Sequence, residues 1–247
     1  MLAIWKREVQ NYFLTPIGYV FMGIFLLVGG IFFFLNNILS ASADLSTMFG
    51  NLSYLFMLAV PILTMKLLSE EKRSKSDQLL LTSPRSIWDI VLGKFLAACT
   101  VLLATMAVTL LYVIVLYVYS NDMIYGTAVQ AGLIISNYLG FFLLGCGYIA
   151  IGVLMSALTE NQVSAAVLTL GVNMLLQMIE SVLPQITLPG GLSFLNVGFS
   201  WLSMYTRYYE FAAGVLSIAN VFYFVSLCGV ILFLAVRVID KRRWSEG

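Results

Sequence analysis

The sequence is dominated by six apolar runs separated by short polar or charged stretches. A helix needs roughly 20 mainly apolar residues to cross a bilayer, and a charge at mid-membrane costs about 2.5–3.5 kcal/mol, so the charges delimit the spans. The expected spans cover about residues 17–35, 52–67, 95–119, 133–155, 163–183 and 215–236. Only 10% of the residues are charged, whereas soluble domains carry about a quarter. We therefore expect an all-α integral membrane protein with a single transmembrane domain over residues 1–247.

The basic residues predict how this domain is oriented. All but one of the 13 Lys and Arg residues lie before the first span, between the second and third spans, or after the last. The exception, Arg207, falls on the opposite side. By the positive-inside rule, both termini and the loop between spans two and three are cytoplasmic. We expect a multi-pass protein of a bacterial-type plasma (inner) membrane.

The composition argues against several kinds of catalysis. The chain has no histidine and a formal charge of +1, which excludes histidine metal sites, Ser-His or Cys-His nucleophiles and a strongly basic nucleic-acid surface. Its cysteines, Cys99, Cys146 and Cys228, lie in separate apolar runs and are expected to be small core residues. We predict no catalytic, metal-binding or cofactor-binding residue.

A phosphate-binding loop is also missing from the sequence. Gly93-Lys94 is followed by Phe95 and lacks the preceding glycine at the required spacing. The chain is therefore not expected to be an enzyme or to hydrolyse ATP by itself.

Residues 1–13 are expected to form a helix along the inner leaflet, because their apolar side chains share one face at helical pitch. Trp5, Lys6 and Arg7 are the expected anchor at the membrane interface, and Thr15-Pro16 ends the helix. The alternative is a frayed amphipathic terminus.

The loop between spans two and three predicts a short cytoplasmic helix that docks on another surface. Glu70 and Arg73, and Glu71 and Lys75, have spacings that favour helical ion pairs, and Leu79 to Leu81 form an apolar patch. Ser86 to Asp89 resemble a capping box that starts the next helix. A merely solvated charged face is the alternative. The candidate partner-contacting residues here are Glu70, Glu71, Lys72, Arg73, Lys75, Asp77, Leu79 and Leu80.

The stretch before the last span combines proline, glycine and aromatic residues, and we expect it to dip into the outer leaflet and return. Its aromatic residues have an ordinary explanation in the interfacial belt. A role in gating is the alternative, with Glu180, Trp201, Tyr205 and Arg207 as the candidate residues.

Glycines in the fourth span repeat every seven residues, as Gly140 with Gly147 and Gly145 with Gly152. Such small-residue stripes favour close packing of helices. Lining a translocation path is the alternative interpretation.

Three stretches carry a resemblance to a known family: Lys6 to Tyr19, Glu70 to Phe95, and Leu158 to Gln162. With the six-span layout, the chain resembles type-2 ATP-binding-cassette (ABC-2) transporter permeases over essentially its whole length. It is similar to the branch that includes gliding-motility and nitrous-oxide-cluster permeases. One departure is Lys75-Ser76-Asp77, where relatives often have Gly-Thr and then Glu.

The resemblance implies a division of labour between subunits. Residues 1–13 would be an elbow helix, about Glu70 to Leu81 a coupling helix on a separate cytoplasmic ATPase, and Pro184 to Glu210 outer re-entrant helices. Thr159, Glu160 and Asn161 would form a second contact with that ATPase, which holds the ATP and Mg²⁺. A second permease chain, the same or related, would complete a dimeric transmembrane domain within membrane lipid. The implied activity is ATP-driven export of an unidentified substrate by alternating access.

Three other functions compete with this one. An ion-coupled carrier or channel would need charged mid-membrane positions and an internal repeat, and neither is clear in the sequence. Glu70-Glu71 resembles the paired-glutamate motif of intramembrane prenyl-protein proteases, but the histidines that such a protease requires are absent from the sequence. A scaffold that transports nothing would not stimulate any ATPase.

Overall fold

The computed structural model describes the whole chain except residues 74–85, 121–129, 183–202 and 246–247. The described residues form helices and turns, without a strand. The helices are α1 (Leu2–Leu14), α2 (Pro16–Phe33) with its π-helical continuation η1 (Phe34–Ile38), α3 (Ser46–Ser53), α4 (Phe56–Thr64), α5 (Ser69–Arg73), α7 (Ile87–Ser120), α8 (Ala131–Leu158), α9 (Gln162–Val182), α11 (Met204–Ala212) and α12 (Ile218–Ser245). Within the described part of the chain, five helices are long and apolar enough to cross a membrane, or up to six if a bent pair counts as one span. The predicted class, a helical multi-pass membrane protein, is confirmed.

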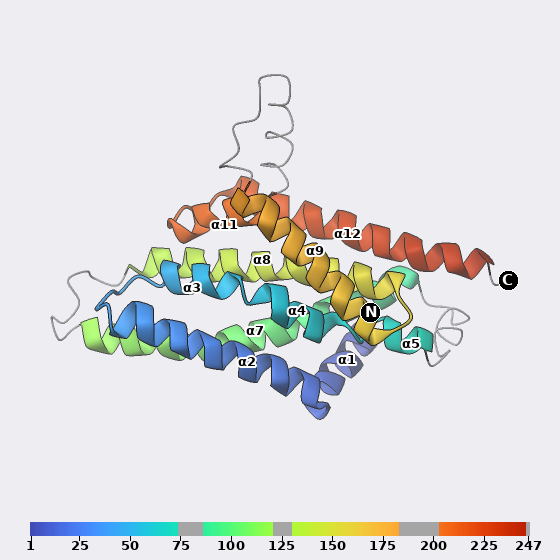
Figure 1. Cartoon of the computed structure of the whole chain (residues 1–247), viewed down its shortest axis with the longest axis horizontal. Helices are drawn as coiled ribbons and strands as arrows, with labels where there is room; N and C mark the ends of the chain where they lie inside the picture. The colour runs from blue at the N-terminus through green and yellow to red at the C-terminus, as the bar shows by residue number, and fades with distance from the viewer. Residues whose placement is uncertain (74–85, 121–129, 183–202, 246–247) are drawn as a thin grey trace, which may run out of the picture.

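The long helices run alongside one another, and α8 lies at the centre of the bundle (Figure 1). In the most apolar 18-residue window of α8, 72% of the window is buried inside the bundle, whereas the corresponding share is 17–33% in the other four candidate spanning helices. It packs against α4, α7, α9, α11 and α12. The other helices turn large apolar side chains outward, as a lipid environment requires.

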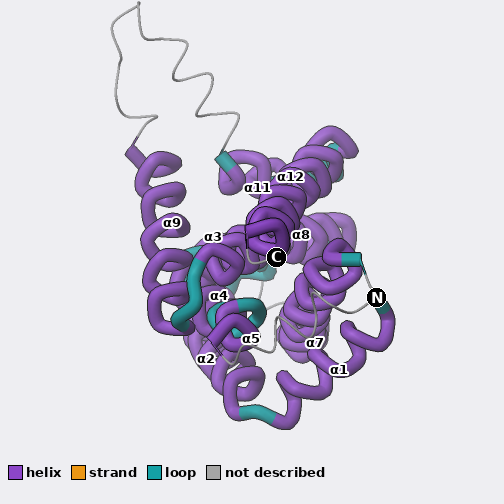
Figure 2. Tube along the Cα trace, turned by 90° about the vertical axis from the view of Figure 1, so that its right-hand side faces the viewer, coloured by secondary structure: helices purple, strands orange, loops and turns teal. Residues whose placement is uncertain are grey.

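The two ends of the bundle carry different elements. α1, α5, the turn between α8 and α9 and the C-terminal end of α12 lie at one end, and α3 and α11 lie towards the other (Figure 1). Figure 2 looks onto the first of these ends. We call it the termini-bearing end.

The second apolar run is not a straight helix over 52–67. Ser46–Ser53 and Phe56–Arg73 meet at a bend of 56°. The first part starts before the expected span, where the Asp44 carboxylate accepts a hydrogen bond from the backbone N–H of Ser46 (2.8 Å). Pro61 lies inside α4, but the bend falls before it, between Ser53 and Phe56.

The third span begins at Ile87, well before the expected start near residue 95. The Ser86 hydroxyl accepts a hydrogen bond from the Trp88 N–H (3.3 Å), as a capping serine does. The Asp89 carboxylate instead lies 3.7 Å from the amino group of Met1. The serine half of the expected capping box is therefore present, while the acidic side chain connects α7 to the start of α1.

The glycines of α8 lie where neighbouring helices approach most closely. Gly152 lies against Thr64 of α4, Gly145 against Leu102 of α7, and Gly140 against Phe211 of α11. At Gly147 an added methyl carbon would come within 2.9 Å of the sulfur of Met204. The packing interpretation of the stripes is confirmed for these four positions.

The cysteines are buried, as expected for small core residues. The Sγ atoms of Cys99 on α7 and Cys146 on α8 lie 3.5 Å apart, so the two residues belong to one helix contact.

Gly152→Ala tests this packing, with Gly171→Ala as its matched control. A methyl group at 152 would overlap Thr64, whereas nothing lies within 4 Å of one at 171. Overpacking costs about 1–3 kcal/mol, and alanine is otherwise the better helix former. We expect a lower thermal unfolding midpoint in detergent for Gly152→Ala, and an unchanged or higher one for Gly171→Ala. Equal midpoints would contradict the assigned contact.

Candidate functional site

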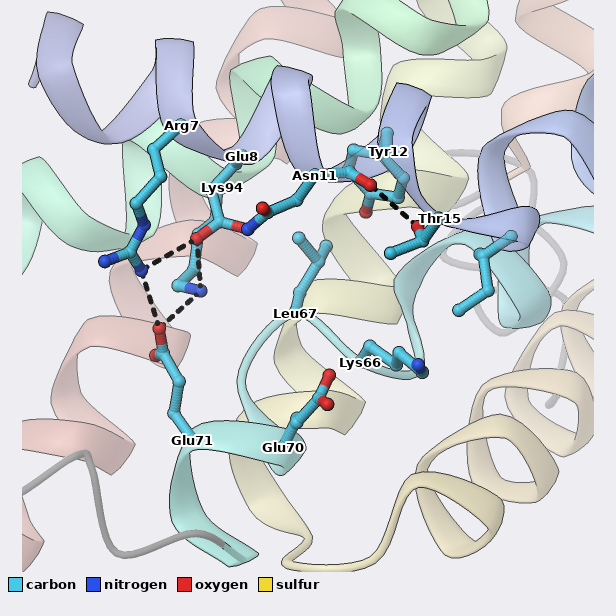
Figure 3. A pocket seen from close by; sticks show the side chains of 11 residues that line it. Arg7, Glu8, Asn11, Tyr12, Thr15, Lys66, Leu67, Glu70, Glu71 and Lys94 are labelled. Carbon is cyan, nitrogen blue, oxygen red and sulfur yellow. Dashed lines mark hydrogen bonds and ion pairs between the residues drawn. The ribbon is translucent and has the colours of Figure 1, made fainter.

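Four charged side chains from three helices meet at the termini-bearing end (Figure 3). We call Arg7, Glu8, Glu71 and Lys94 the ion-pair cluster. The Lys94 ammonium lies 2.8 Å from Oε1 of Glu71 and 3.2 Å from Oε1 of Glu8. The Arg7 guanidinium bridges the same two carboxylates, 3.2 Å from Glu8 and 3.6 Å from Glu71. The cluster therefore joins α1, α5 and α7.

Most of the cluster is shielded from solvent. The side chain of Lys94 is 3% exposed, those of Glu8 and Glu71 are 11% and 16% exposed, and Arg7 is 60% exposed. Burying an unpaired charge costs several kcal/mol, and removing one partner of a buried pair leaves such a charge behind. With two cations facing two anions, the cluster is neutral. The arrangement fixes the position of α5 relative to α1 and α7.

Other side chains of α1 hold its inner face against the bundle. The Trp5 indole N–H donates to the Thr100 hydroxyl (3.0 Å), and the Tyr12 hydroxyl donates to the Leu63 carbonyl (2.7 Å). Burial, reinforced by the nearby Glu8 carboxylate, raises the pKa of Tyr12 well above its usual value, so its hydroxyl stays a donor. Glu8 lies between Trp5 and Tyr12 on the same helical face.

The three residues predicted to anchor α1 at the membrane interface, Trp5, Lys6 and Arg7, lie in different surroundings. Trp5 is half-buried against α7, Arg7 takes part in the ion-pair cluster, and Lys6 is exposed.

A pocket of about 350 Å³ opens beside the cluster, between α1, the start of α2, and the segment from α4 to α5. The side chains on its wall carry both signs of charge (Figure 3). They are Arg7, Glu8, Asn11, Tyr12, Thr15, Ile17, Lys66, Leu67, Glu70, Glu71 and Lys94. The residues that the structure describes contain no group of His, Cys, Asp and Glu suited to a metal ion.

α5 is also attached to the end of α8. The Ser156 hydroxyl accepts hydrogen bonds from the backbone N–H groups of Leu68 (3.0 Å) and Ser69 (3.1 Å). The Lys72 ammonium donates to the carbonyl of Ala157. α5 is thus connected to the end of α8, next to the turn that leads into α9, as well as to α1 and α7.

That turn contains the second predicted contact. The Thr159 hydroxyl donates to the Met155 carbonyl (3.0 Å), and the Asn161 side chain accepts from the Val163 N–H (3.0 Å) and so caps α9. Glu160 and Asn161 are exposed. The structure therefore brings the two predicted partner-contacting stretches together at one end.

The structure describes the predicted coupling segment only as far as Arg73. Lys75, Asp77, Leu79 and Leu80 lie outside the described residues. Glu71 contacts Arg7 and Lys94, and the expected Glu71–Lys75 pair, which includes a residue outside the described part, stays a prediction. Glu70 and Arg73 are exposed on α5.

Two of the four predicted gate residues lie on α11, away from the ion-pair cluster. The Tyr205 ring packs against those of Tyr208 (5.8 Å) and Tyr54 (6.3 Å). The Arg207 guanidinium donates to the Asn220 side chain (3.3 Å). Trp201 and the side chain of Glu180 are outside the described part of the chain.

The C-terminal carbonyls of α11 are held by polar side chains of other helices. The Ser136 hydroxyl donates to Phe211 and the Ser46 hydroxyl donates to Ala212, each at 2.8 Å. The Asn137 amide donates in turn to the Ser46 hydroxyl (3.0 Å). α3 and α8 therefore fix this short helix, which the apolar pattern alone does not locate.

At the termini-bearing end, the sequence analysis missed three residues that hold the helices together: Glu8, Lys94 and Ser156. A signal existed for Glu8, which is acidic within the apolar face that Trp5 and Tyr12 define. A signal existed for Lys94 as well, because a charge beside an apolar run is expected to have a partner. Nothing in the sequence singles out Ser156.

The fold defines the class as a multi-pass helical membrane protein with linked polar elements at one end. A comparison with family models matches residues 8–239 to the ABC-2 family transporter proteins. The chain belongs to the ABC-2 transporter family, so it is the membrane-spanning permease subunit of an ABC transporter. In this family ATP hydrolysis belongs to a separate ABC ATPase subunit. No curated protein matches the chain significantly.

Lys94→Met tests the ion-pair cluster. The substitution removes the more deeply buried of the two cations that face Glu8 and Glu71, and losing one partner of a buried pair costs about 3 kcal/mol. We expect a marked loss of stability in SDS titrations followed by circular dichroism.

Lys6→Met is the control, because Lys6 is exposed on the same helix. Adding Glu71→Gln to Lys94→Met restores neutrality through Arg7 and Glu8, so the double variant should recover part of the loss. If the double variant is destabilised by the sum of the single effects, the two residues do not interact.

Proposed function

We propose that this chain is the permease subunit of an ABC-2 exporter, in which α5 and the turn between α8 and α9 receive movement from the ATPase. The observation that carries this proposal is the attachment of α5 to α1, α7 and α8 at the termini-bearing end. Because of these connections, an external push on α5 would displace α1, α7 and α8 together.

The physical mechanism is a lever. A helix bound to a partner that closes on ATP moves with that partner, and the ion pairs and hydrogen bonds of α5 transfer the displacement to the packed helices. Rigid-body rocking of packed helix groups is an established means of alternating access. The permease contributes no covalent step, since bond cleavage takes place in the ATPase.

The exposed charges at this end suit a polar contact with that subunit. Glu70 and Arg73 on α5, and Glu160 with Asn161 in the neighbouring turn, are exposed. Charge complementarity of this kind favours specific docking and correct register. α5 would be the start of the coupling helix, continuing into residues outside the described part.

The remaining features of the proposal follow from the sequence and the family. α1 would be the elbow helix on the inner leaflet, both termini would be cytoplasmic, and the bent pair α3–α4 would complete six spans. Pro184 to Glu210 would form the outer re-entrant segment. Two permease chains, identical or related, would enclose the path of an unidentified substrate in a bacterial-type inner membrane.

The narrower likeness to gliding-motility and nitrous-oxide-cluster permeases stays a prediction from the motifs. Family membership favours the ATP-driven mechanism over the ion-coupled carrier or channel.

The experiment reverses two exposed charges of α5 and leaves Glu71 and Lys72, which connect α5 to the other helices, unchanged. Glu70→Lys combined with Arg73→Glu should reduce copurification with the cognate ATPase at least several-fold, since each reversed charge would face a like charge on the partner. The loss of ATPase stimulation by the permease should parallel it. The thermal unfolding midpoint of the permease variant alone separates a loss of binding from a loss of folding.

Lys6→Glu is the matched control, because Lys6 is an exposed charge at the same end but outside α5 and the turn. It should keep full assembly. Unchanged assembly and stimulation in the double reversal would overturn the coupling role of α5.

A further inference from the structure

A second hollow lies at the termini-bearing end, between the start of α7 and the end of α12. Its volume is about 300 Å³, and its walls include Ser86, Trp88, Phe233, Arg237 and Asp240. We call it the α7–α12 groove. It shares no residue with the ion-pair cluster or its pocket.

The floor of the groove is aromatic and its rim is cationic. The Trp88 and Phe233 rings lie 6.0 Å apart, and the Arg237 guanidinium lies 5.0 Å from the centre of the Phe233 ring. Stacking on a ring leaves the edge donors of a guanidinium directed outward. Arg237 is 64% exposed, and its pairing with Asp240 is long, at 3.7 Å.

The sequence at the end of α12 is rich in basic residues. Residues 237–243 contain four basic side chains and one acidic one, Asp240. Lys241 follows Arg237 by one helical turn and is exposed, so the two lie on the same face of α12. Basic clusters that directly follow a membrane-spanning helix attract anionic lipid headgroups.

The groove continues into an apolar surface. Val230, Phe233 and Leu234 are exposed on α12, towards the middle of the span from Arg237, and Leu96 is exposed on α7. Both helices are membrane-spanning candidates, over Ile218–Lys241 and Ile87–Val118. A ligand at this site therefore meets cationic and hydroxyl groups at one end and lipid-facing hydrocarbon along the rest.

We propose that the α7–α12 groove binds an anionic phospholipid of the adjacent leaflet. The phosphate lies between Arg237 and the Ser86 hydroxyl, displacing Asp240 from its long ion pair, and an acyl chain follows Phe233 and Val230. A free phosphate would use only the rim, whereas the lipid uses both the rim and the apolar surface. The inference does not depend on an ATPase partner, because both walls belong to this chain.

The test is native mass spectrometry of the full-length protein from nanodiscs of equal parts phosphatidylglycerol and phosphatidylcholine. The wild-type chain should retain phosphatidylglycerol at least several-fold over phosphatidylcholine. Arg237→Gln combined with Lys241→Gln should remove most of that preference. Arg207→Gln, which removes a cation from α11, should keep it.

A competition arm distinguishes a lipid from a free phosphate. Adding glycerol 3-phosphate, the headgroup chemistry without acyl chains, should not displace the lipid, and displacement at millimolar concentration would overturn the lipid assignment. If the wild type shows no headgroup preference, or if the double variant keeps it, the site is wrong. The wild-type comparison alone can refute the proposal, so the test holds even if the double variant misfolds.

Discussion

One buried ammonium group, that of Lys94, determines how the termini-bearing end is organised. In a medium of low polarity it is stable only beside opposite charge, and the Glu8 and Glu71 carboxylates supply that charge from two other helices. Arg7 balances the second carboxylate. Since no single helix contains the whole set, the N-terminal helix and the short α5 segment must occupy defined positions on α7. The need of Lys94 for opposite charge thus constrains how α1, α5 and α7 pack together.

The centre of the bundle rests on a different principle, which is steric. Glycines of α8 let Thr64, Leu102 and Phe211 approach its backbone, and close approach maximises dispersion contacts where lipid offers no hydrophobic driving force between helices. Packing therefore fixes the interior, while ion pairs and serine hydrogen bonds fix the end. The polar connections lie where the bundle meets water, and the apolar ones lie where it does not.

The helical membrane fold could be predicted from the sequence because mean hydropathy reports directly on burial in lipid. Helix ends were less predictable, because α7 and α12 extend past their apolar cores into polar residues near Ile87 and Lys241. The bend at Tyr54 and Leu55 has no proline or glycine to reveal it. At the site, local spacing drew attention to Glu70, Glu71 and Arg73, but local spacing pairs a residue only with neighbours in the chain. Two partners of Glu71, Arg7 and Lys94, come from α1 and α7, and only the packed structure shows them.

The 56° break between α3 and α4 bears on how far a displacement can travel. A straight rod transmits a tilt along its whole length, whereas two segments that meet at a joint can change their angle independently. Motion imposed near Ser69 would thus reorient α4, while α3, whose Ser46 hydroxyl donates to Ala212 of α11, keeps its place. In the proposed transporter, such a joint would let one membrane face open while the other stays closed.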